Sequence, residues 1–99
     1  SEGGIVIALV KPQFEAGKGK VGKKGVIKER STHFEVLKKI ADMSLDEGFT
    51  LRDASFSPVT GAEGNIEFLF HLTADERPIK TYDDDMFNTL IDVAYKELQ

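Results

Sequence analysis

The chain has 99 residues, 40% of them apolar, which suits one small globular domain and no more. Its 17 acidic and 13 basic residues give a net charge of −4, which excludes a uniformly basic nucleic-acid-binding domain but not a basic patch on an acidic body. Because it contains no cysteine, disulfides, thiolate metal sites and cysteine nucleophiles are excluded as well.

Residues 5–10 (IVIALV) form a continuous apolar run rich in β-branched side chains, which predicts a strand buried on both faces, as in a parallel sheet. Pro12 ends this strand, because proline cannot donate to a ladder. The run is far shorter than the roughly 20 residues of a membrane helix. No signal peptide is visible, and the absence of an initiator methionine indicates a fragment or a processed chain.

Residues 15–30 contain four glycines, six basic residues and two acidic residues, and predict a long, mobile, positively charged loop. Basic side chains on such a loop can follow phosphates, with a merely solvated loop as the alternative. The stretch 17–22 spells G-x-G-x-x-G, but it starts several residues past the strand and no helix follows, so we assign no nucleotide site to it. The residues expected to contact an RNA backbone are Lys18, Lys20, Lys23, Lys24 and Lys28.

A helix is predicted to begin near Thr32, because Thr32 and Glu35 have the spacing of a capping box. Gly48 supplies the left-handed residue with which such a helix ends. One face of the helix is apolar and should be buried. That face consists of Phe34, Leu37, Ile40 and Ala41.

The second half of the chain predicts two strands and a helix. Residues 49–57 are a strand that Pro58 ends, and residues 58–65 are a turn rich in glycine and proline. Residues 66–73 alternate as a half-buried strand does. Residues 83–98 are a helix with three aspartates at its start. Its apolar face consists of Met86, Phe87, Leu90, Ile91, Ala94 and Leu98.

This order of elements brings two charged residues together. The strands at 5–10 and 49–57 are joined through a helix and should run parallel, while the strand at 66–73 should run antiparallel to both. If that strand lies between the other two, Lys11 and Glu67 become neighbours at the sheet edge where α/β proteins place their sites. We therefore expect a salt bridge or a water-bridged contact between them, although a structural pair is an alternative.

Four strings are specific as a set: ALVKPQFE, GKKGVIKE, THFEVL and SPVTGAEGNIEFL. Through them, residues 3–73 resemble the C-terminal part of the hemolysin A (TlyA) family of FtsJ-like RNA 2′-O-ribose methyltransferases. The resemblance implies an α/β fold: the C-terminal three-strand portion of a Rossmann-like sheet, with two parallel strands, one antiparallel strand and two helices. It divides the chain into part of the methyltransferase domain at 1–75 and a linker and packing helix at 76–99.

The family's catalytic set is Lys, Asp, Lys and Glu, and its third and fourth members match Lys11 and Glu67. The other two would precede Ser1, as would the glycine-rich loop for S-adenosylmethionine and the S4-like RNA-binding domain. The resemblance thus implies part of an S-adenosylmethionine-dependent rRNA methyltransferase of the cytoplasm, acting on rRNA or a ribosomal subunit. Alone, the chain should be inactive and should bind the cofactor weakly or not at all.

Other functions remain open. A non-catalytic RNA- or ribosome-binding module would use the basic loop alone. A pore-forming protein, as the family name hemolysin suggests, is disfavoured because the chain has no membrane span and no strongly basic amphipathic helix. His33 and His71 predict structural roles, so we expect no metal site. The free edge of residues 5–10 predicts self-association of the chain.

Overall fold

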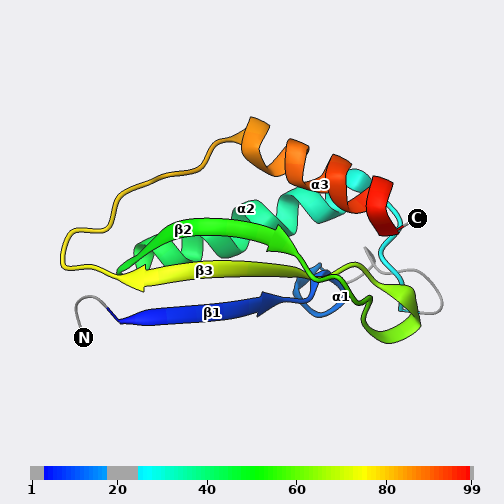
Figure 1. Ribbon diagram of the computed structural model, residues 1–99, viewed down its shortest axis with the longest axis horizontal. Coiled ribbons are helices and arrows are strands. Elements are labelled where there is room, and N and C mark those ends of the chain that lie inside the picture. Colours follow the sequence, from blue (N-terminus) through cyan, green and yellow to red (C-terminus); the bar gives the residue numbers. More distant parts are fainter. Residues whose placement is uncertain (1–3, 18–24, 99) are drawn as a thin grey trace.

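Three strands form the sheet in the computed structural model, which describes residues 4–17 and 25–98 (Figure 1). Strand β1 spans Ile5–Val10, β2 spans Phe49–Phe56 and β3 spans Phe68–Ala74. The strand order is β1-β3-β2, so β3 lies in the middle, which meets the condition on which the expected approach of Lys11 and Glu67 depended. Because β3 is central, it pairs with both other strands, and its first residues lie beside the last residues of β1.

The strand directions correct the prediction of two parallel strands plus one antiparallel strand. Both pairings, β1 with β3 and β2 with β3, are antiparallel, and the described residues contain no parallel pair. β1 and β2 point the same way only because each runs opposite to the strand between them. The sheet therefore has antiparallel ladders throughout.

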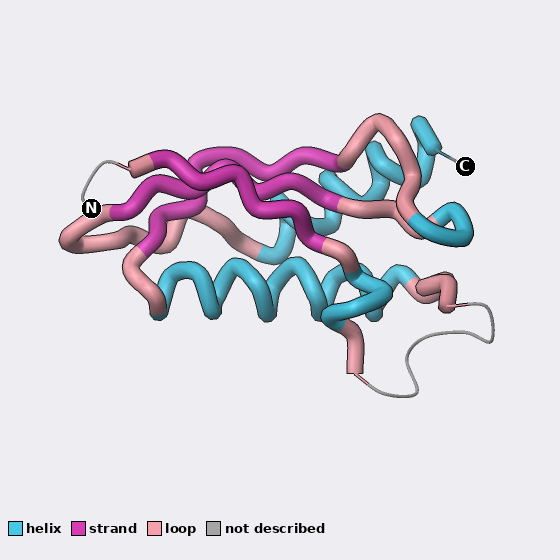
Figure 2. Tube along the Cα trace, turned by 90° about the horizontal axis from the view of Figure 1, so that it is seen from below, coloured by secondary structure: helices cyan, strands magenta, loops and turns pink. Residues whose placement is uncertain are grey.

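The prediction that residues 5–10 are buried on both faces is wrong. Ile5 and Ile7 are 67% and 61% exposed, whereas Val10 is buried. β1 is an edge strand with β3 as its neighbour, and the helices described here leave one sheet face bare (Figure 2). The apolar composition of residues 5–10 predicts a strand, but it does not show whether another element covers that strand.

Helix α2 spans Arg30–Asp46 and lies under the opposite face of the sheet (Figure 2). The predicted capping box is wrong, because the helix begins two residues before Thr32 and the carbonyl of Glu29 accepts the first backbone hydrogen bonds. Thr32 is instead buried inside the first turn. Gly48 follows the helix with a φ of 96°, which confirms the predicted left-handed ending.

Helix α3 spans Asp84–Leu98 and lies past β2 on the side away from β3 (Figure 1). A carboxylate oxygen of Asp83 accepts a hydrogen bond from the backbone N–H of Met86, so this aspartate caps the helix. Phe87 is fully buried, and its ring stacks on Phe70 of β3 with centroids 6.1 Å apart. The core is therefore shared by α2, α3 and the inner face of the sheet.

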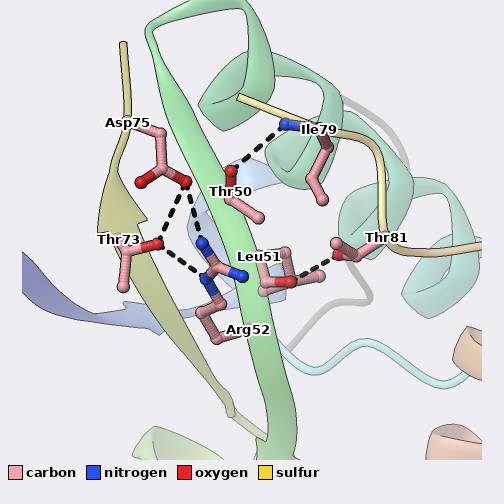
Figure 3. A network of polar contacts seen from close by, with 7 residues as sticks. All are labelled: Thr50, Leu51, Arg52, Thr73, Asp75, Ile79 and Thr81. Carbon is pink, nitrogen blue, oxygen red and sulfur yellow. Dashed lines mark hydrogen bonds and ion pairs between the residues drawn. The ribbon is translucent and has the colours of Figure 1, made fainter. Parts of the chain in front are cut away.

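The segment that leads into α3 runs along the outer edge of β2 (Figure 3). The backbone N–H of Ile79 donates to Oγ1 of Thr50, and the hydroxyl of Thr81 donates to the carbonyl of Leu51. Nearby, the guanidinium of Arg52 lies 3.0 Å from a carboxylate oxygen of Asp75. These contacts give partners to polar groups at an edge that would otherwise be open to another strand.

Candidate active site

Lys11 and Glu67 lie at the same end of the sheet, as predicted. The last pair in the register of β1 and β3 is Val10 with Phe68, so Lys11 follows one member of the pair and Glu67 precedes the other. Glu67 lies just outside β3 rather than within it, which corrects the expected strand start at residue 66. The antiparallel ladder is what brings together two residues that are far apart in sequence.

No direct ion pair joins Lys11 to Glu67 within the described residues, so of the two contacts expected, a salt bridge or a water-bridged contact, the salt bridge is not formed. Lys11 is the N-cap of a short helix that sequence reasoning missed, α1 at Pro12–Glu15. Its ammonium lies 5.6 Å from the ring centroid of Phe14, within the range of a cation–π contact. The carboxylate of Glu67 instead accepts a hydrogen bond of 2.8 Å from Nε2 of Gln13.

Glu67 is only 6% exposed, and a glycine makes room for its carboxylate. A β-carbon at Gly61 would lie 2.0 Å from Oε2 of Glu67, closer than any real contact. Gly61 belongs to the turn around the short 3₁₀ helix η1 (Ala62–Gly64), and its backbone N–H donates to the carbonyl of Asn65. The turn therefore holds the glycine against the carboxylate, and any larger side chain there would displace it.

Asn65 connects this turn to Gly25 and Ile27, near the end of the positively charged stretch 15–30. Its Oδ1 accepts a hydrogen bond of 2.9 Å from the backbone N–H of Ile27, and its Nδ2 donates to the carbonyl of Gly25. Asn65 is 1% exposed. Sequence reasoning assigned it to the turn but could not identify its partners, because they lie about 40 residues away in the chain.

Lys28 is the one member of the predicted RNA-binding set that the structure describes, and it is exposed. It follows the buried Ile27, which anchors the segment. The other four members, Lys18, Lys20, Lys23 and Lys24, lie outside the described residues.

His33 is buried between α2 and α3, and its Nδ1 shares a hydrogen bond with the hydroxyl of Tyr95. Burial lowers the pKa of His33 from 6.5 to about 4, because desolvation disfavours the charged imidazolium. In the parts of the chain that the structure covers, no group of three or more histidine, aspartate and glutamate side chains could hold a metal ion. His33 thus has the contacts of a core residue.

S-adenosylmethionine would need a cavity of its own size among the described residues. A hollow between α1 and α2, lined in part by Ala16, Thr32 and Val36, has a volume of about 80 Å³. Sites for ligands of this kind usually enclose about 300–1,000 Å³. Two further hollows among the described residues are larger, at about 280 and 230 Å³, but also lie below that range. None of these three hollows encloses enough space for the whole cofactor.

Comparisons with known proteins show which family and which relatives the chain is similar to. The sequence model of a family described as FtsJ-like methyltransferase matches residues 2–74. The chain is 53% identical over 70 residues to "Putative rRNA methyltransferase YqxC" of Bacillus subtilis, covering 71% of this chain and 25% of that protein. It is 34% identical over 67 residues to the 16S/23S rRNA (cytidine-2′-O)-methyltransferase TlyA of Mycobacterium tuberculosis, covering 68% of this chain and 25% of that protein.

A solved structure of a "putative hemolysin" from Streptococcus thermophilus has the same fold. It matches with a TM-score of 0.92 at 40% sequence identity, and the match covers 98% of this chain and 34% of that one. The chain thus spans about a quarter of the length of the curated relatives named above and about a third of this structure.

Proposed function

Since the chain belongs to the FtsJ-like methyltransferase family, we propose that it forms the C-terminal part of an rRNA 2′-O-ribose methyltransferase and carries two members of its catalytic set, Lys11 and Glu67. The observation that carries the proposal is the register Val10–Phe68, at which both residues lie next to the same end of the sheet. The name of the mycobacterial relative supports the 2′-oxygen of ribose as the methyl acceptor.

The chemistry explains the residue types. A ribose hydroxyl is a poor nucleophile until its proton leaves as the oxygen attacks the methyl carbon, and S-adenosylmethionine supplies that methyl group when bound. We assign proton removal to Lys11 and the orientation of the lysine to Glu67. A lysine in water is charged at neutral pH and cannot accept a proton, so it needs neighbouring groups that favour the neutral amine.

Those neighbours would include the first Lys and the Asp of the family's set, which match no position in this chain. We therefore propose that the 99-residue chain alone is inactive and binds S-adenosylmethionine weakly or not at all. The partner of the complete enzyme is rRNA or a ribosomal subunit in the cytoplasm, and the residues placed on the RNA backbone are Lys18, Lys20, Lys23, Lys24 and Lys28.

Two alternatives predict different results. A non-catalytic RNA-binding module would need the basic segment but not Lys11 or Glu67. A pore-forming protein would need a membrane-active element, and none of the helices in residues 4–17 and 25–98 is long and apolar enough to cross a bilayer. Among the functions compared, methyl transfer alone gives the buried Glu67 a role.

A chimera tests the proposal: this chain replaces the matching segment of the mycobacterial relative, and transfer of tritiated methyl groups to rRNA is measured. We expect the chimera to be active and Lys11→Ala to abolish turnover while cofactor binding, measured by calorimetry, persists. Lys96→Ala, in the last turn of α3, is the matched control and should behave as the parent. A folded, cofactor-binding chimera without transfer, or near-normal turnover of Lys11→Ala, would contradict the assignment.

A further inference from the structure

Gln13 is a polar side chain of the site to which the family's catalytic set gives no role. It lies in the first turn of α1, two residues after Lys11, and its Nε2 donates to Oε2 of Glu67 at 2.8 Å. Because a carboxylate oxygen can only accept hydrogen bonds, the nitrogen end of the amide must face Glu67. The orientation of the amide is therefore fixed by its partner.

The opposite end of the same amide has no partner. Oε1 of Gln13 is buried and accepts no hydrogen bond from any described residue. A buried acceptor left unpaired lowers the stability of the fold by an amount comparable to what the hydrogen bond at the other end of the amide contributes. The net gain in stability from this glutamine is therefore small. Because most buried polar atoms have a hydrogen-bond partner, the unpaired Oε1 calls for an explanation other than stability.

The carboxylate that Gln13 contacts is also confined by Gly61, which leaves no room for a side chain beside Oε2. Glu67 is attached to the turn by its backbone as well, since its carbonyl accepts a hydrogen bond of 2.8 Å from the N–H of Ser57. The only hydrogen-bond donor to the carboxylate among the described side chains is Gln13. The hydrogen bond from Gln13 sets the orientation of the Glu67 carboxylate, whereas the missing side chain at Gly61 leaves room for it.

We propose that Gln13 is a positioning residue: it orients the carboxylate of Glu67 toward the reacting end of the sheet, and it acts on the reaction only through that carboxylate. The inference rests on the proposed function, because orientation matters only if Glu67 takes part in the reaction. A misplacement on the order of 1 Å in such a group can lower a rate about 100-fold.

The test uses the chimera with Gln13→Leu, which keeps a side chain of similar size and removes the donor. We expect kcat to fall about 10- to 100-fold while the KM for rRNA changes less than about twofold, because the residue contacts a protein carboxylate and not the RNA. In a Glu67→Gln background the same substitution should lower kcat no further. Glu63→Gln, an exposed carboxylate in the same turn, is the matched control.

A second readout does not depend on activity. With ¹³C at the glutamate side-chain carboxyls, the Glu67 resonance should shift in Gln13→Leu and stay in place in Glu63→Gln. An unmoved Glu67 resonance, or losses of kcat that multiply in the double variant, would overturn the positioning role. A wild-type chimera that transfers no methyl group would contradict the proposed function instead, so the two failures are distinguishable.

Discussion

His33 links the stability of the domain to pH at the scale of a single side chain. Its pKa is about 4 in the folded protein and near 6.5 in an unfolded chain, so below pH 6.5 the unfolded chain takes up a proton that the folded one does not. The folded state is therefore most favoured above pH 6.5 and loses stability as the pH falls toward 4. Each pH unit within that window removes at most about 1.4 kcal/mol from the free energy of unfolding.

Urea denaturation of the wild-type chain and of His33→Gln at several pH values between 7 and 4 measures this link. The glutamine keeps a hydrogen-bond partner for the Tyr95 hydroxyl but does not titrate, so the wild type should lose more stability than the variant as the pH falls. A constant difference between the two proteins across this range would contradict the assignment. Asp75 does not distinguish the two proteins: a hydrogen bond from Thr50 and the charge of Arg52 lower its pKa, and both proteins contain these groups.

At the scale of elements, α3 belongs to the same core as the sheet although it lies beyond the family match, which ends at residue 74. Phe87 is fully buried against Phe70 and Tyr82. We expect Phe87→Ala to lower the free energy of unfolding by about 3–5 kcal/mol, from the lost burial and the cavity left behind.

Thermal and urea denaturation measure that loss. Val93→Ala on the same helix is the control, because Val93 is 44% exposed and its truncation should cost less than about 1 kcal/mol. Equal, small effects of the two substitutions would show that α3 adds little to the core. A large effect at Phe87 alone supports a single folding unit that includes the helix.

At the scale of the whole molecule, the outer edge of β1 predicts association between copies of the chain. β1 pairs with β3 on one side, and Ile5, Ile7 and Leu9 are exposed on the bare face of the sheet. Unpaired backbone groups beside apolar side chains favour pairing with another chain. We expect the 99-residue chain to self-associate and Ile7→Lys to keep it monomeric, because a lysine on this face opposes the burial of the edge.

Sedimentation velocity over a range of protein concentrations distinguishes these states. Val59→Lys is the control, since Val59 is 71% exposed but lies in the turn after β2, away from the edge. A wild-type chain that is monomeric at every concentration would contradict the prediction, and so would an equal effect of both lysines.

Local sequence signals determined much of this fold. The apolar run 5–10 and the helical period of residues 83–98 gave elements whose observed bounds are Ile5–Val10 and Asp84–Leu98. Connection rules predicted that β3 runs opposite to both other strands, which places Lys11 and Glu67 at the same end of the sheet once β3 lies between them. These features depend on neighbours in sequence or on the order of elements, both of which can be read from the chain.

Only the tertiary structure decided which groups surround Glu67. Gln13 and Gly61 meet its carboxylate, and Asn65 holds Gly25 and Ile27, through contacts that depend on how a short helix and a turn pack. That Glu67 takes Gln13 rather than Lys11 as its direct partner has the same origin, because side-chain direction and available space select a hydrogen-bond partner, and position along a strand does not. The exposure of β1 also depends on whether other elements cover it, and composition does not encode that.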